Sequence, residues 1–249
     1  VYTFACLRMD QFVHGRVIFA GDSAHGVSPF GARGANSGVQ DAENLAWKLD
    51  WVLQGRASPA LVGTYGPERE YAADENLCNS TRATDFITPK SEVSRLFRDA
   101  ALYLAREHAF ARRIVNSGRL SVPATLHQSP LNTPDTDHFA GTQVPGAVLL
   151  DAPLTKQGQP TWLLRELGPD FTLLVFGPAP AWAHGLPGVK VLQIGIDVID
   201  HQALAAQRLD ALPRTVYLVR PDQHVCARWR TPTEVAVRSA LARATAAAV

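Results

Sequence analysis

Cysteine is scarce in this chain of 249 residues, and the three cysteines present, Cys6, Cys78 and Cys226, lie far apart without a Cys-x-x-Cys pair. This spacing excludes a dithiol redox motif and gives no indication of a disulfide framework, so we expect reduced structural thiols in a cytoplasmic protein. The eight histidines show no metal-ligand spacing, which argues against a zinc site.

Long apolar runs and an excess of charge of one sign are also missing. No stretch approaches the roughly 20 apolar residues that cross a bilayer, and no signal peptide opens the chain, so we expect no membrane partner. The 24 basic and 23 acidic residues leave a net charge of +1 without a basic run, which argues against nucleic acid as a partner. Because Ser23 lacks a Gly-x-Ser-x-Gly setting, a hydrolase nucleophile is not expected.

The most informative stretch begins at Arg16 and runs through a glycine-rich loop. Val17 to Ala20 is a short apolar run that predicts a buried strand. Asp22 follows its carboxyl end, where open α/β sheets bind ligands and where a carboxylate can accept hydrogen bonds from sugar hydroxyls. Gly31 and Gly34 would let the backbone of the loop approach a flat ligand closely.

A helix is predicted after Asn36, because apolar residues recur at three- and four-residue steps, at Val39, Ala42, Leu45, Ala46, Leu49, Val52 and Leu53. Asp41 and Asn44 fall largely outside this stripe, which is expected to face the core. The free N–H groups of the first turn and the helix dipole would stabilise an electron-rich carbonyl or a developing anion beside the loop.

Four parts of the chain together closely resemble the second FAD-binding motif of single-component flavoprotein aromatic hydroxylases: Gly15 to His25, Pro29 to Gly31, Gly34 to Gly38, and Asp41 to Leu49. This family includes p-hydroxybenzoate hydroxylase, phenol hydroxylase and 3-(3-hydroxyphenyl)propionate hydroxylase, and the match spans roughly Tyr2 to Arg69. The resemblance implies a flavin-dependent monooxygenase that hydroxylates a phenolic or other aromatic substrate with NAD(P)H and oxygen.

By position, the resemblance assigns the cofactor site to Gly21, Asp22, Pro29, Gly31, Gly34, Ala35, Asn36 and Ser37. It implies that Asp22 contacts the ribityl chain of FAD and that the amides of Gly34 to Ser37 face the pyrimidine side of the flavin. The Pro29 backbone would lie near the substrate, and no side chain is identified as catalytic. Ala35 departs from the Met or Leu often found in the family, and His25 is expected to be structural.

Two family features are absent from the chain. Family members open with a Gly-x-Gly-x-x-Gly turn that holds the ADP half of FAD, and they carry an Asp-Gly motif in mid-chain, whereas this sequence has neither and begins at Val1. We therefore expect the C-terminal portion of a longer hydroxylase, with the N-terminal FAD-binding part missing. Such a fragment should bind little or no FAD by itself.

The predicted fold class is α/β. Residues 1–117 are expected to form the C-terminal part of a p-hydroxybenzoate hydroxylase-like FAD-binding domain, residues 118–146 a proline-rich linker, and residues 147–249 a domain that resembles thioredoxin but lacks Cys-x-x-Cys. Helices are predicted at 68–86 and 91–116, with a break or kink near Gly66-Pro67 and an apolar stripe from Leu96 to Val115. In the last domain, strands are predicted at 147–150, 171–176, 189–194, 215–219 and 225–229, and helices at 161–167, 202–212 and 232–247.

A non-catalytic role stays open as an alternative. Because Cys226 stands alone in the C-terminal domain, that domain is expected to serve interaction or dimerisation, which favours a homodimer. In the alternative hypothesis the flavin region is vestigial and the thioredoxin-like domain is an assembly module. The aromatic substrate and the choice between NADH and NADPH also stay open.

Overall fold

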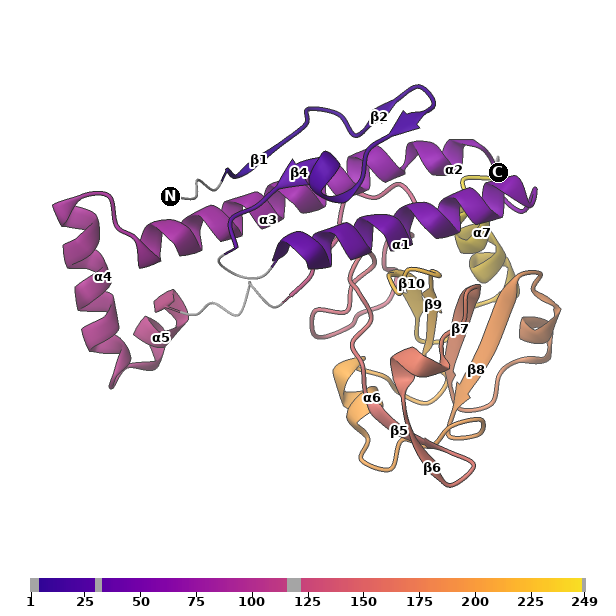
Figure 1. Ribbon diagram of the computed structural model, residues 1–249. Helices are drawn as coiled ribbons and strands as arrows, with labels where there is room; N and C mark the ends of the chain where they lie inside the picture. The colour runs from indigo at the N-terminus through magenta and orange to yellow at the C-terminus, as the bar shows by residue number, and fades with distance from the viewer. Residues whose placement is uncertain (1–4, 30–32, 116–121, 248–249) are drawn as a thin grey trace. The chain divides into compact units, whose positions relative to one another are not determined.

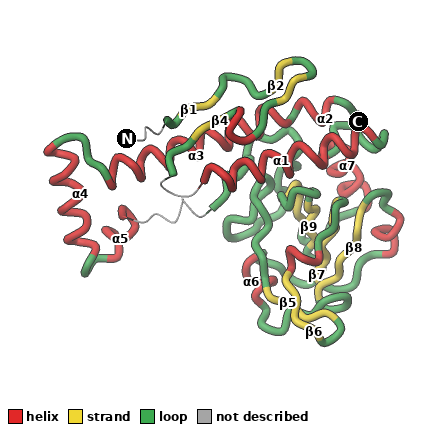
Figure 2. Tube along the Cα trace, in the orientation of Figure 1, coloured by secondary structure: helices red, strands yellow, loops and turns green. Residues whose placement is uncertain are grey.

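The computed structural model describes residues 5–29, 33–115 and 122–247 (Figure 1). They divide into two compact units, each built from two stretches of chain: Val1–Glu43 with Tyr65–Ala124, and Asn44–Thr64 with Thr125–Val249. The expected boundary near residue 117 differs from this division, because residues 44–64 and 125–146 belong to the second unit. Helices dominate the first unit and strands with short helices the second (Figure 2).

The first unit begins with short strands joined in antiparallel pairs, β1 (Leu7–Arg8) with β4 (His25–Gly26) and β2 (Val13–His14) with β3 (Val17–Ile18). A single 3-10 turn, η1 (Gly21–Ser23), follows β3. The prediction of a buried strand at Val17 to Ala20 is wrong, because only two of its residues pair and Val17 is 56% exposed. A two-stranded hairpin with an exposed face cannot bury an apolar run on both sides.

Helix α1 (Arg33–Leu53) buries several of the polar residues that lie outside the predicted apolar stripe. Val39 and Leu53 are 59% and 83% exposed, whereas Asp41, Asn44 and Lys48 are buried. The expectation that the apolar stripe of this helix faces the core is therefore wrong. The first half of α1 lies beside α3 (Tyr65–Ile87) (Figure 1). Polar side chains of the two helices form hydrogen bonds with each other, which makes their burial possible.

The helix break predicted near Gly66-Pro67 is present slightly earlier, at Thr64. Helix α2 (Ala60–Gly63) ends before Thr64, and α3 starts at Tyr65, so the break precedes the proline. Pro67 then lies in the first turn of α3, where its missing N–H would have no partner within the helix.

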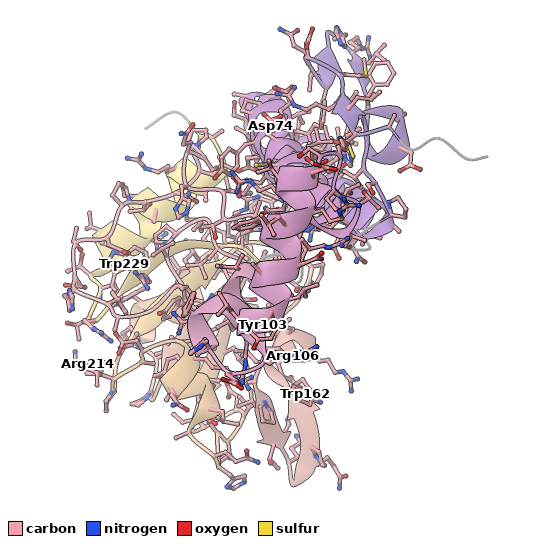
Figure 3. All side chains as sticks on the ribbon, turned by 90° about the vertical axis from the view of Figure 1, so that its left-hand side faces the viewer. Asp74, Tyr103, Arg106, Trp162, Arg214 and Trp229 are labelled. Atoms are coloured by element: carbon pink, nitrogen blue, oxygen red, sulfur yellow. The ribbon has the colours of Figure 1, made fainter. Side chains whose placement is uncertain are left out.

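Helices α4 (Glu92–Ala105) and α5 (Ala109–Val115) replace the single helix predicted over residues 91–116. Ser91 caps α4 by accepting a hydrogen bond from the Ser94 N–H at 3.1 Å. The predicted stripe is exposed along most of its length, with Leu96 72% and Phe97 58% exposed. At the end of α4, the Arg106 guanidinium lies over the Tyr103 ring at 5.8 Å from its centroid (Figure 3).

The second unit contains a four-stranded sheet in the order β10-β9-β7-β8. Its strands are β7 (Phe171–Phe176), β8 (Val189–Ile194), β9 (Val216–Val219) and β10 (Val225–Trp229). Strands β7 and β8 are parallel and the other two pairs are antiparallel. The four strand predictions for this region are confirmed within one residue, and the observed order is compatible with the thioredoxin-like assignment, which stays a prediction.

Both faces of this sheet are covered. One face packs Phe171 and Leu173 against Trp47 and Trp51 of α1 and against α7 (Glu234–Ala244). The opposite face carries Leu174, and the cluster there includes residues of η3 (Leu163–Glu166) and α6 (Leu204–Arg208). All six residues of β7 are buried, as expected for a continuous apolar strand covered on both sides.

The segment predicted as a linker is tied to the sheet along residues 125–146. The Gly146 N–H donates to the Val225 carbonyl at 2.7 Å, and the Thr133 N–H donates to the Cys226 carbonyl at 2.8 Å. The strand predicted at residues 147–150 is wrong, because it is reduced to one bridge between Val148 and His224. An unpredicted hairpin, β5 (Pro153–Lys156) with β6 (Gln159–Trp162), follows. Among the described residues, no helix combines the length and apolarity needed to cross a bilayer.

Candidate functional site

The acidic turn after β3 is built on a close approach of two glycines. Gly21 has a φ of +60°, a conformation that favours glycine, and a Cβ on Gly38 would lie 3.4 Å from the Gly21 Cα. The Gly38 position of α1 therefore reaches the turn at van der Waals distance. Asp22 in this turn is exposed, so its carboxylate is accessible to a ligand.

The buried carboxylate of Asp41 holds the acidic turn in place through hydrogen bonds. Asp41 of α1, which is fully buried, accepts hydrogen bonds from the Gly21 N–H at 2.8 Å and from His25 Nε2 at 2.7 Å through one oxygen. Its other oxygen accepts from Arg69 Nε of α3 at 2.6 Å. His25 is thus structural, as predicted, although its partner is a carboxylate and its ring stacks on Phe12.

The protonation of this cluster follows from its partners. Burial disfavours the charged form of Asp41, but the His25 hydrogen bond, the Arg69 charge and the Gly21 N–H outweigh burial and lower the pKa of the carboxyl. Burial also raises the pKa of the Tyr65 hydroxyl, and the Asp41 charge acts in the same direction. Tyr65 is therefore a neutral donor near pH 7.

Three residues in the first two turns of α3 hold the same loop. The Tyr65 hydroxyl donates to the Phe19 carbonyl at 2.9 Å, Arg69 contacts Asp41, and Glu70 Oε1 accepts from the Phe12 N–H at 2.8 Å. These contacts give the segment Tyr65 to Arg69 a structural role. Three side chains of one helix thus fix the hairpin and the acidic turn.

A polar cavity of about 350 Å³ lies at the first turns of α1. Its lining includes Arg33, Asn36, Ser37 and Gln40 of α1, Asn76 of α3 and Val122. Arg33 Nη1 donates to Asn76 Oδ1, and burial lowers the pKa of its guanidinium. The helix dipole places a partial positive charge at the start of α1, so the cavity end of α1 favours electron-rich or anionic groups.

The structure brings some of the predicted site residues together. Asn36 and Ser37 line this cavity, Gly34 and Ala35 belong to the same first turn, and Gly21 touches α1 through Gly38. The Ser37 side chain is already engaged, because it donates to the Arg33 carbonyl and accepts from Asn76 Nδ2, both at 2.7 Å. Ser37 also lies in the second turn, where a backbone N–H is used within the helix.

The other predicted residues lie apart from the cavity lining. Asp22 and Pro29 are both exposed, and neither lines the cavity. Gly31 lies outside the described residues.

Sequence reasoning missed the residues that support the site. Asp41 was placed outside the apolar stripe of α1 without a role of its own, and Asn76 was given no role. Asp41 and Ser37 are four residues apart and therefore share a helix face, and this spacing was the available signal. Asp41 and Ser37 can be buried because Arg69 and Asn76 of α3 form hydrogen bonds with them.

Residues 2–80, which contain the turn, α1 and most of α3, match a family model described as FAD binding domain. The matched segment includes the acidic turn and the start of α1, the parts on which the sequence resemblance to the flavoprotein hydroxylases rests.

Curated relatives extend beyond this segment. The 4-methyl-5-nitrocatechol 5-monooxygenase of Burkholderia sp is 30% identical over 89% of this chain and 41% of its own length. The 3-(3-hydroxy-phenyl)propionate/3-hydroxycinnamic acid hydroxylase of Klebsiella pneumoniae is 28% identical over 81% of this chain and 38% of its own length. The chain thus spans less than half the length of these relatives.

A solved structure supports the fold assignment over almost the whole chain. The flavin-dependent monooxygenase PieE, in complex with FAD and substrate, superimposes with a TM-score of 0.75 at 24% identity, over 98% of this chain and 50% of that chain. At this identity the likeness concerns the fold. The α/β fold class predicted from the sequence is confirmed, and the similarity of residues 2–80 to an FAD binding domain agrees with the predicted family resemblance.

Proposed function

We propose that the protein acts as an FAD-dependent monooxygenase that hydroxylates a phenolic or other aromatic substrate. The observation that carries this proposal is the acidic turn at Asp22 held against α1 by Gly21, Gly38 and Asp41. The names of relatives support the substrate class, since both curated relatives above act on hydroxylated aromatic rings. NAD(P)H is proposed as the co-substrate.

The residues present fit a flavin. Asp22 offers an exposed carboxylate, which can accept hydrogen bonds from ribityl hydroxyls. The first turn of α1 lies beside a polar cavity, and the partial positive charge of a helix N-terminus suits the polar edge of the isoalloxazine. Ala35 and Asn36 are exposed on this turn, so a flat ring can reach the backbone there.

Each residue has a role in this proposal. FAD supplies oxygen activation when bound, and the protein contributes binding, orientation and electrostatics. Asp22 binds the ribityl chain, and the amides from Gly34 onward stabilise negative charge on the pyrimidine side. The backbone at Pro29 positions the substrate. Asp41 acts through Gly21 and is a positioning residue.

Further contacts to the cofactor are proposed to lie outside this chain, because the curated relatives are more than twice as long as the matched region. A homodimer and a cytoplasmic location are also proposals. The first rests on the single buried Cys226, whose thiol pKa is raised to about 12 by burial and which is unsuited to redox chemistry.

The proposal is tested on the whole protein by its colour and by its consumption of NAD(P)H. We expect a yellow protein that oxidises NAD(P)H faster when a phenol is added, with a hydroxylated product detected by mass spectrometry. A colourless protein that cannot be reconstituted with FAD would contradict the proposal and favour the assembly role.

The contribution of Asp22 is tested by Asp22→Ala in the whole protein. Losing one charged hydrogen-bond partner should weaken FAD binding about tenfold, which corresponds to about 1.4 kcal/mol. The fluorescence of FAD, titrated with the protein, measures this. Asp10→Ala, which removes another exposed carboxylate of the first unit, should leave FAD affinity unchanged. Equal effects of the two substitutions would exclude a specific role for Asp22.

A further inference from the structure

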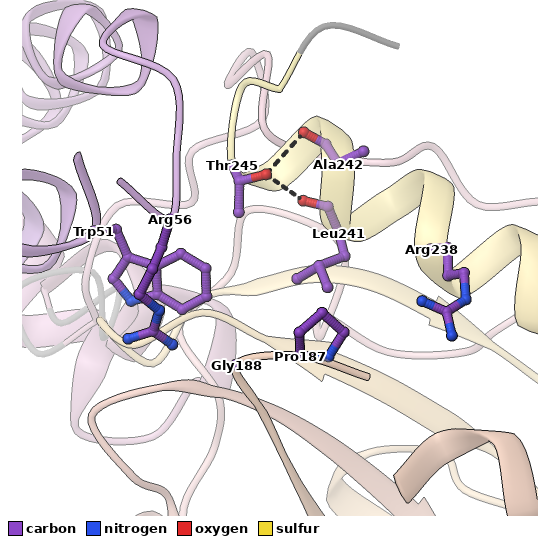
Figure 4. A pocket seen from close by; sticks show the side chains of 8 residues that line it. All are labelled: Trp51, Arg56, Pro187, Gly188, Arg238, Leu241, Ala242 and Thr245. Carbon is purple, nitrogen blue, oxygen red and sulfur yellow. Dashed lines mark hydrogen bonds between the residues drawn. The ribbon is translucent and has the colours of Figure 1, made fainter. Parts of the chain in front are cut away.

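A second cavity, of about 310 Å³, lies within the second unit (Figure 4). It shares no lining residue with the cavity at the start of α1. Its lining includes Trp51 and Arg56 near the end of α1, Pro187 and Gly188 before β8, and Arg238 and Leu241 of α7. The volume is at the lower end of the range of about 300 to 1,000 Å³ that small-molecule sites occupy.

The floor of this cavity is apolar and flat. Trp51 is 3% exposed, and the Arg56 guanidinium stacks on its ring at 3.9 Å from the centroid. Gly188 has a φ of +66°, and a Cβ there would lie 2.6 Å from Arg56 Nη2 and 3.0 Å from the Trp51 ring. The glycine therefore keeps the stacked pair in place. Pro187 and Leu241 continue the apolar surface beside it (Figure 4).

Two cationic side chains flank the apolar floor, with Arg56 on one side and Arg238 on the other (Figure 4). Arg56 pairs with Asp170 at 2.6 Å, and Arg238 pairs with Glu234 through Nε at 2.8 Å. Both pairs are partly exposed, and such pairs are weak, so an incoming carboxylate can compete for the guanidinium groups. In the described part of the chain, Arg238 donates through Nε alone, which leaves both terminal nitrogens for a ligand.

We propose that this cavity binds a small organic anion with a flat apolar body, such as an aromatic carboxylate. The apolar body lies against Pro187, Leu241 and the outer face of the exposed Arg56 guanidinium, which covers the buried Trp51 ring, and the carboxylate accepts hydrogen bonds from Arg238. An arginine stacked on an aromatic ring presents a planar, desolvated cation, which suits a flat anion. This site is independent of the flavin motif and of the proposed monooxygenase function.

The test is a titration of the 249-residue chain with 2-naphthoate, followed by calorimetry and by amide NMR. We expect saturable binding with shifts at Gly188, Leu241 and Ala242. The neutral isostere 2-naphthamide should bind at least tenfold more weakly. Arg238→Gln should weaken naphthoate binding at least fivefold, whereas Arg243→Gln, an exposed arginine on the same helix outside the lining, should change it less than twofold.

Several results would overturn the proposal. Absence of saturable binding, equal affinity for the amide, or equal effects of the two arginine substitutions would each do so. Shifts at Asn36 and Gln40 instead of Gly188 and Leu241 would place the ligand in the other cavity and also refute the site. Arg238 is half exposed, so Arg238→Gln should fold normally, and its circular dichroism spectrum checks this. None of these outcomes depends on FAD binding.

Discussion

Replacing Asp41 by asparagine is expected to destabilise the first unit by about 3 kcal/mol, because it leaves the buried Arg69 guanidinium without its carboxylate. The Gly21 N–H and His25 lose a charged acceptor in the same step. The midpoint of urea unfolding, compared between Asp41→Asn and the unsubstituted chain, measures the loss. Amide hydrogen exchange at Gly21 should accelerate more than at residues of β7.

The control for this substitution is Asp50→Asn, on the same helix. Asp50 is exposed and accepts from Gln54 at 2.7 Å, so its replacement should cost less than about 0.5 kcal/mol. If Asp41→Asn were as mild as Asp50→Asn, the buried cluster would not hold the turn.

The same substitution predicts a pH dependence. Because the folded state lowers the pKa of Asp41, its ionisation stabilises the fold above the unfolded pKa of about 4, and this contribution is lost as the pH falls through the folded value. The stability difference between the unsubstituted chain and Asp41→Asn should therefore be constant from about pH 6 to pH 7 and shrink below about pH 4. A difference that grew on acidification would contradict the assignment of the lowered pKa.

Asp222→Asn is expected to have an effect of similar size in the second unit, about 3 kcal/mol. Asp222 is buried, it accepts two hydrogen bonds from the buried Arg220, and it accepts another from Asn44 Nδ2 at 2.9 Å. Asn44 in turn accepts from Lys48 Nζ at 2.8 Å. Although burial opposes its charge, the Arg220 and His224 charges hold the pKa of Asp222 well below its ordinary value.

Unfolding of the second unit is followed by tryptophan fluorescence, because the Trp47 and Trp51 rings contact Phe171 with centroid distances of 5.6 and 5.0 Å. Asp170→Asn is the control, since Asp170 is a half-exposed partner of Arg56 and its pair should contribute less than about 1 kcal/mol. A midpoint for Asp222→Asn as high as that for Asp170→Asn would show that the buried pair does not stabilise the unit.

The two networks explain why α1 was misread from its sequence. Apolar periodicity assumes that buried faces are apolar, and this assumption fails where buried polar groups are paired. Asp41 meets Arg69, which is 28 residues further along the chain, and Asn44 meets Asp222, which is 178 residues away. Local sequence windows contain no information about such partners.

The sheet of the second unit was predictable for the opposite reason. Strands β7 and β8 are parallel and β7 is covered on both faces, so Phe171 to Phe176 had to be continuously apolar. The turn between β9 and β10 contains Pro221 and Asp222, residue types that favour a tight reversal. In strand β7 and in this turn, the local conformational preference of the residues agrees with the structure that they adopt in the folded unit.

By itself, the sequence determined the order of the motif that resembles the flavin hydroxylases, the acidic turn at Asp22 and the strands β7 to β10. Those features depend on residue types at fixed spacing, and this spacing can be read from the unfolded chain. Only the tertiary structure decided which face of α1 is buried, that Val17 is exposed, and that Asp41, His25 and Arg69 form the support of the turn. The physical reason is that a buried charge is stable only beside its partner, and folding alone brings such partners together.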